Sequence, residues 1–94
     1  MLSLDTIISK NTKVPWRIIE GEAVLVKVDS GEVIHLNEVA AEIWRIIDGK
    51  KSISEIIDHI HNHFEVGREQ AKKDTLKFFQ SLSKKNLIIE KESE

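Results

Sequence analysis

The chain has 94 residues, no cysteine and a formal net charge of −2 at pH 7. Its length predicts a single domain over residues 1–94, and its small net charge excludes a general electrostatic attraction to nucleic acid or anionic membranes. The lack of cysteine excludes disulfides and thiolate chemistry, and no apolar run approaches the roughly 18 residues of a membrane span. We therefore expect a small cytoplasmic domain, and so short a chain favours a binding module over an enzyme.

A β signal follows the first fifteen residues, which are weakly patterned. Branched and aromatic side chains fill three runs, at residues 16–19, 23–28 and 33–36. Gly21 lies in the short turn between the first two runs, and a cluster of turn-forming residues at 29–32 separates the second from the third. Connections this short predict an antiparallel meander of three strands.

The run from residue 37 to residue 49 predicts a helix directly after the third strand. Asn37 is of a type that accepts hydrogen bonds from the free N–H groups at a helix start. Apolar residues then recur at steps of three and four, at Val39 or Ala40, Ile43, Trp44 and Ile47. Gly49 supplies the left-handed conformation that ends many helices.

Two more helices are expected after this one. Ser52 and Glu55 have the spacing of a capping box, and Gly67 can cap a third helix over residues 68–85, with Asn86 as its left-handed stop. Residues 87–89 form either a short strand or a packed tail, and residues 91–94 are expected to fray. The fold class is therefore α+β and winged-helix-like, a three-stranded antiparallel sheet followed by three helices.

The expected third helix carries more apolar residues than one stripe needs. At about 100° per residue, a narrow core face collects Ala71, Thr75, Phe78 and Leu82. The shoulder of that face carries Lys72, Leu76, Phe79 and Ser83. Two interpretations of the shoulder are open: it packs against the first strand or the N-terminal segment, or it lines one wall of a groove.

No motif for catalysis or for a cofactor occurs in the sequence, which has neither a phosphate loop nor a nucleophile elbow. His59 and His63 have the i, i+4 spacing of two metal ligands on one helix face, but Ile60 stands where a metalloprotease motif needs glutamate. Surface histidines near a helix C-terminus are the simpler explanation, so we expect no metal site. The lysines of the third helix are offset by acidic residues, which disfavours DNA binding.

Several runs carry a resemblance: Leu36-Asn-Glu-Val-Ala-Ala-Glu-Ile-Trp44, Asp48-Gly49, the helix start at Ser52, and Asp74-Thr-Leu-Lys-Phe-Phe-Gln-Ser-Leu82 followed by Asn86-Leu-Ile. Together they are similar to the coenzyme PQQ synthesis protein D family, whose domains are also called recognition elements for ribosomally made, post-translationally modified peptides. The resemblance covers about residues 16–90 in order, and its most specific part is the first of these runs.

The resemblance implies a cofactor-free, non-catalytic peptide chaperone that works beside a modifying enzyme, often a radical S-adenosylmethionine protein. The leader segment of a precursor peptide would add as an extra strand along Val33, Ile34, His35 and Leu36. The opposing wall would be the helix shoulder, where Leu76 and Phe79 receive apolar side chains, Lys72 pairs with an acidic residue, and Ser83 completes the surface.

Two other function classes remain open from the sequence. The winged-helix-like arrangement is also compatible with a DNA-binding regulator, and the small size with a subunit that docks on a larger enzyme. An uncapped third strand would further permit two copies of the chain to pair through the same edge.

Overall fold

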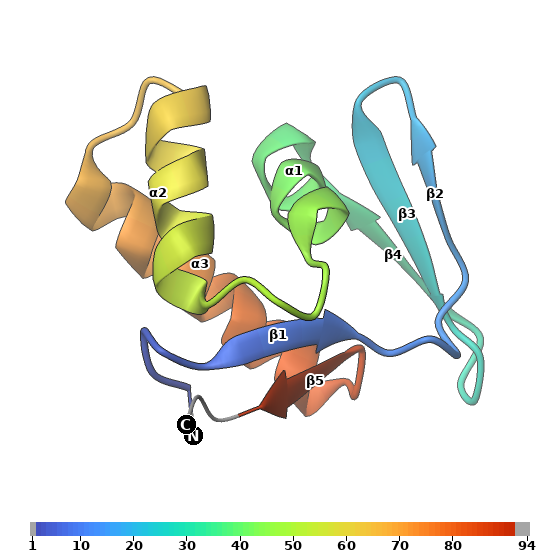
Figure 1. Ribbon diagram of the computed structural model, residues 1–94. Helices are drawn as coiled ribbons and strands as arrows, with labels where there is room; N and C mark the ends of the chain where they lie inside the picture. The colour runs from blue at the N-terminus through green and yellow to red at the C-terminus, as the bar shows by residue number, and fades with distance from the viewer. Residues whose placement is uncertain (1, 92–94) are drawn as a thin grey trace.

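The computed structural model describes residues 2–91, which contain two antiparallel sheets and three helices. In chain order the elements are β1 (Ile7–Lys10), β2 (Trp16–Ile19), β3 (Glu22–Lys27), β4 (Glu32–Leu36), α1 (Glu38–Ile46), α2 (Ile53–His63), α3 (Arg68–Lys84) and β5 (Ile88–Lys91) (Figure 1). One sheet has the strand order β2-β3-β4, and β1 pairs with β5 in the other. Figure 1 shows α1 between the larger sheet and the pair α2 and α3, with β1 and β5 across the foot of the helices.

The larger sheet confirms the predicted meander and the α+β fold class. Its strands pair in sequence order, and its inner face is set by β3, on which Ala23 and Leu25 are fully buried against the helices. Val24 and Val26 alternate with them and therefore lie on the outer face. One side of the sheet is thus committed to the core, while the other carries apolar side chains toward solvent.

The predicted start of each of the first two helices is confirmed by its cap. The Ala40 N–H donates to Asn37 Oδ1 at 2.9 Å. At α2, the Glu55 N–H donates to Ser52 Oγ at 3.2 Å, and the Ser52 N–H donates to Glu55 Oε1 at 3.0 Å, which is the reciprocal pair of a capping box. Both helices therefore begin where short local signals place them.

The predicted end of α1 at Gly49 is wrong, because the helix ends at Ile46. Gly49 does adopt the expected positive φ, of 78°, but it does so in the connection to α2. There its N–H donates to the Ile8 carbonyl at 3.1 Å, and a Cβ at this position would lie 3.0 Å from Ser9 Oγ. The glycine is therefore needed for a close approach to β1 and not for a helix cap.

The pairing of β1 with β5 was not predicted, because the first fifteen residues showed no clear strand pattern. Its register runs from Ile7 opposite Lys91 to Lys10 opposite Ile88, and Ile8 is fully buried. The open choice for residues 87–89 is thus settled as a strand that begins at Ile88, directly after the buried Leu87. The expected fraying is wrong for Lys91, while residues 92–94 lie outside the described part. Each of the two strands has only four residues, which is too short to show a clear alternation of apolar and polar side chains. Its partner also lies at the opposite end of the chain.

The core face of α3 differs from the prediction at one residue. Ala71, Thr75 and Leu82 are buried as expected, but Phe79 is fully buried and Phe78 only half-buried. At about 100° per residue, Phe79 lies about 40° from Thr75, and Phe78 about 60° from it in the other direction. The core therefore centres nearer to Phe79.

None of the described helices is long and apolar enough to cross a membrane.

Candidate functional site

β4 is an open edge of the larger sheet. β3 pairs with it on one side, from Ala23 opposite Leu36 to Lys27 opposite Glu32, and no strand within the described residues pairs with its other side. Backbone N–H and C=O groups along that side therefore lack sheet partners. Such an edge is a template for another extended segment.

The side chains of β4 divide between the two faces of the sheet. Leu36 is buried and Ile34 is half-buried against the core, since their partners on β3 belong to the inner face. Val33, which is 53% exposed, and His35 alternate with them on the outer face. Only Ile34 and Leu36 therefore point toward the helices.

A cavity of about 460 Å³ opens beside the end of β4, between the start of α1 and one side of α3. Its lining comprises Asn37, Val39, Ala40, Ile43, Ile60, Val66, Ala71, Asp74, Lys77, Phe78 and Ser81. The floor is apolar, whereas the α3 rim carries one acidic, one basic and one hydroxyl side chain. This combination suits an apolar side chain with polar groups around it.

An ion pair connects the other end of β4 to α3. Lys85 Nζ lies 2.9 Å from the Glu32 carboxylate, at the point where α3 ends and β4 begins. Asn37, directly after β4, lies at the cavity with Phe78, so strand and helix run alongside each other in opposite directions. We call the cavity beside the end of β4, with the side of α3 that carries Asp74, Lys77, Phe78 and Ser81, the β4–α3 groove.

The eight residues predicted for the site do not line one groove. Val33, Ile34, His35 and Leu36 form the open edge, as the strand prediction requires. On α3, Ser83 Oγ donates to a Glu90 carboxylate oxygen of β5 and lines a separate cavity with Leu2. At about 100° per residue, Lys72 and Leu76 each project within about 20° of the direction of Ser83. This half of the prediction therefore lies on the side of α3 that faces β5 and the N-terminal segment.

Phe79 was predicted to line the groove, but its ring is fully buried in the core and does not reach the groove. The side of α3 that does line the groove carries Asp74, Lys77, Phe78 and Ser81, which sequence reasoning missed. The sequence prediction placed Phe78 in the core, although polar residues beside its apolar ring were a signal that could have identified it as a groove residue. Which flank of the helix faces β4 depends on tertiary packing, and no local pattern encodes it.

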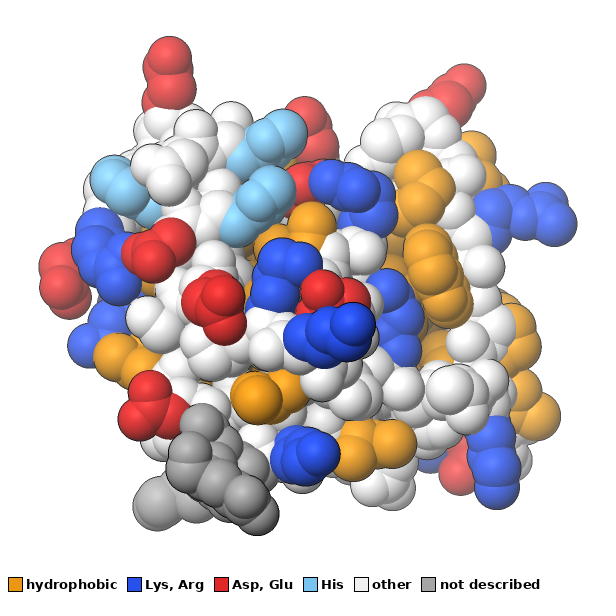
Figure 2. All heavy atoms as spheres, in the orientation of Figure 1, with side chains coloured by type: hydrophobic (Ala, Val, Ile, Leu, Met, Phe, Trp, Pro, Cys, Tyr) orange, Lys and Arg blue, Asp and Glu red, His pale blue; other side chains and the backbone are white. Residues whose placement is uncertain are grey.

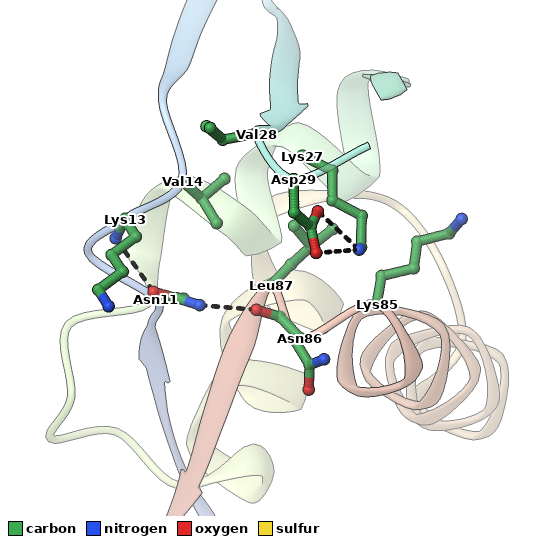
Figure 3. A pocket seen from close by; sticks show the side chains of 9 residues that line it. All are labelled: Asn11, Lys13, Val14, Lys27, Val28, Asp29, Lys85, Asn86 and Leu87. Carbon is green, nitrogen blue, oxygen red and sulfur yellow. Dashed lines mark hydrogen bonds and ion pairs between the residues drawn. The ribbon is translucent and has the colours of Figure 1, made fainter. Parts of the chain in front are cut away.

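A second hollow, of about 320 Å³, lies beyond the C-terminal end of α3 (Figure 3). Figure 3 shows its polar groups turned toward one another: Asn11 Nδ2 donates to the Asn86 carbonyl at 2.8 Å, and Lys27 pairs with Asp29 at 2.9 Å. Groups that satisfy each other in this way leave little for a ligand. The β4–α3 groove is therefore the stronger candidate site.

Comparison with protein families gives one clear match. The family model described as Coenzyme PQQ synthesis protein D (PqqD) matches residues 22–88, from the first residue of β3 to the first residue of β5. The matched stretch includes β4, all three helices and both walls of the groove.

Two curated proteins, each named PqqA binding protein, are similar in sequence. The one from Gluconobacter oxydans (strain 621H) is 39% identical over 49 residues, which cover 52% of this chain and 51% of that protein. The one from Pseudomonas syringae pv. syringae (strain B728a) is 43% identical over 56 residues, which cover 60% of this chain and 58% of that protein. The chain thus spans little more than half the length of the relatives it matches.

Two solved structures share the fold. TbiB1 in complex with the TbiA(beta) leader peptide has a TM-score of 0.77 and 28% identity, over 85% of this chain and 93% of that chain. Lasso peptide synthetase B1 complexed with the leader peptide has a TM-score of 0.76 and 22% identity, over 87% of this chain and 96% of that chain. The second likeness concerns the fold alone.

Proposed function

Because the chain belongs to the family of coenzyme PQQ synthesis protein D, we propose that it binds the leader segment of a ribosomally made precursor peptide. The leader adds to the larger sheet as an extra strand along β4. The observation that carries this proposal is the unpaired edge of β4 beside the β4–α3 groove. The names of the curated relatives, and the leader peptide in the TbiB1 complex, support the same class of ligand.

Strand addition explains how such a site combines affinity with selectivity. Main-chain hydrogen bonds to the edge of β4 accept almost any sequence, and every second side chain of the added strand points to the same face. Those that enter the groove meet Phe78 and the apolar floor beside Ala40, while Lys77 and Asp74 offer opposite charges at its rim. We assign Lys77 the pairing with an acidic leader residue that the sequence prediction gave to Lys72.

The role of the chain in this proposal is delivery, and the chemistry takes place on a partner. A held leader keeps the rest of the precursor at a high effective concentration near a modifying enzyme. We propose a peptide-modifying partner, with a radical S-adenosylmethionine enzyme as the specific candidate, and a cytoplasmic location where precursors are made. Ordering a flexible leader costs a few kcal/mol, which keeps its affinity moderate and its release easy.

The outer face of the larger sheet favours docking on a larger enzyme as a second role. Ile19 is 49% exposed there and Val33 is 53% exposed, so apolar surface remains on the side of the sheet away from the helices. This face and the groove lie on different sides of β4, so a partner and a leader would not compete. A homodimer formed through β4 would compete, because it occupies the same edge.

Two matched variants test the groove. Ser81→Arg places a long cation on the groove side of α3, and Gln80→Arg places the same group one residue away on the side of Leu2 and Glu90. Both positions are exposed, so neither change disturbs the core. Fluorescence anisotropy with a labelled leader, taken from a precursor encoded beside the gene, measures the affinity.

We expect Ser81→Arg to weaken leader binding by about tenfold, equivalent to about 1.4 kcal/mol, and Gln80→Arg to leave it unchanged. Equal affinities in both variants would remove the groove from the proposal. Binding of generic duplex DNA with a steep salt dependence, and of no leader, would instead support the DNA-binding alternative.

A further inference from the structure

A cluster of possible metal ligands lies away from the groove, where α1 meets the C-terminal end of α2. Glu42 of α1 and His59 and His63 of α2 each offer one ligand atom, and these atoms all lie within 4.8 Å of one another. Figure 2 shows histidine side chains gathered over α2, next to acidic and basic side chains toward α1. The leader-binding proposal makes no use of this cluster.

The helix period of α2 aligns the two imidazoles. Residues four apart share one face of a helix, and the rings of His59 and His63 stack with centroids 5.3 Å apart and planes 13° from parallel. His59 Nε2 lies 2.6 Å from Glu42 Oε2 across the helix interface. Glu42 is thus the third ligand that the sequence alone did not place, since it comes from another helix.

Arg45 holds the carboxylate of Glu42 in place. Its Nε donates to Oε1 at 2.9 Å and its Nη2 to Oε2 at 2.7 Å, and these bonds are the main reason that the pKa of Glu42 falls to about 2. Each carboxylate oxygen has two lone pairs, so Oε1 keeps one after the arginine is bound, and Oε2 regains one when His59 Nε2 binds a metal in place of the carboxylate. Arg45 therefore orients the carboxylate and leaves it able to bind a cation.

A hydrogen bond between His59 and Glu42 would be the simpler role for these two groups, but it does not involve His63. Among the described residues, the side chain of His63 makes ring contacts with His59 and Phe64 and no hydrogen bond. Its side chain is exposed, and its ring is free to turn without disturbing the core. The cluster thus holds a fixed carboxylate, a half-buried imidazole and an adjustable one.

We propose that Glu42, His59 and His63 bind a zinc ion that joins α1 to α2. Two imidazoles and one carboxylate are the protein ligands of many zinc sites, which keep a fourth position for water or another ligand. Bond lengths of about 2.0–2.2 Å place tetrahedral ligand atoms about 3.3 Å apart. The 2.6 Å contact must therefore widen slightly, and His63 must move inward, both of which are small side-chain adjustments.

Chelator-treated protein titrated with zinc sulfate in a calorimeter tests the proposal. His63→Gln removes the exposed ligand, and Glu42→Gln removes the carboxylate. The matched control is His61→Gln, because His61 lies on the same helix between the two ligands but its Nδ1 bonds to the Val66 carbonyl. Circular dichroism checks that each variant retains its helices.

We expect the parent chain to bind one zinc ion. His63→Gln and Glu42→Gln should each bind zinc at least about tenfold more weakly than the parent chain, and His61→Gln should bind it with unchanged affinity. NMR spectra should show zinc-induced shifts in the rings of His59 and His63. The proposal is overturned if zinc does not bind, if binding survives both ligand substitutions, or if the His61 variant loses as much affinity. The last two results would describe adventitious binding to surface histidines.

Discussion

Replacing Phe79 and Phe78 separately with alanine tests which aromatic ring of α3 belongs to the core. Phe79 is fully buried, and Phe→Ala at such a site costs about 3–5 kcal/mol of stability. Phe78 is half-buried, so its ring removes about 100 Å² of apolar surface from water, which is worth about 2.5 kcal/mol at about 25 cal/mol per Å². We therefore expect Phe79→Ala to be clearly the more destabilising variant.

Urea unfolding and thermal unfolding, each followed by circular dichroism, measure both effects. A domain of this size loses about 4–8 °C in Tm for each kcal/mol, so Phe79→Ala should lower Tm by about 12 °C or more. Phe78→Ala should remain folded at room temperature and lose leader affinity, because its ring lines the groove. Equal destabilisation by the two changes, or a larger loss for Phe78→Ala, would refute the assignment of the two faces.

Two further predictions concern the connection between α1 and α2. Gly49→Ala should destabilise the fold more than Gly21→Ala: both have positive φ, which costs about 1–2 kcal/mol for alanine, but only Gly49 also has a side-chain oxygen 3.0 Å from the new Cβ. Thermal unfolding compares the two, and equal losses would contradict the predicted contact. Hydrogen bonds from Lys51 and from two backbone N–H groups lower the pKa of Asp48. The ionised carboxylate therefore stabilises the folded chain at any pH above about 3.9, the usual aspartate pKa. This contribution is lost progressively as the pH falls below that value. The stability difference between the parent chain and Asp48→Asn should therefore be present at neutral pH and shrink below pH 4, as acid titrations of both would show; a difference that does not change with pH would contradict it.

Local signals in the sequence predict most of the fold correctly. Asn37 and the pair Ser52 and Glu55 act within one helical turn, so the residues alone place the two helix starts. Asn86 adopts a φ of 59°, the left-handed conformation expected just after α3. The three strands of the larger sheet are joined by short turns, which makes their pairing local as well.

Features that depend on distant parts of the chain were missed. The pairing of β1 with β5 joins the two ends of the sequence, and neither strand is long enough to show alternation. The side of α3 that faces β4 is fixed by how the helix docks on the core, and the prediction placed the groove wall on its opposite flank. Glu42 joins the two histidines of α2 only because two helices pack together.

NMR titration of the labelled chain with a leader peptide tests the central claim most directly. Strand addition predicts large amide shifts and new protection from hydrogen exchange along β4, with shifts at Phe78 and Ser81 across the groove. It also predicts small changes at Lys72 and Ser83, on the far side of α3. Shifts centred on Lys72 and Ser83, with the amides of β4 unchanged, would contradict the account.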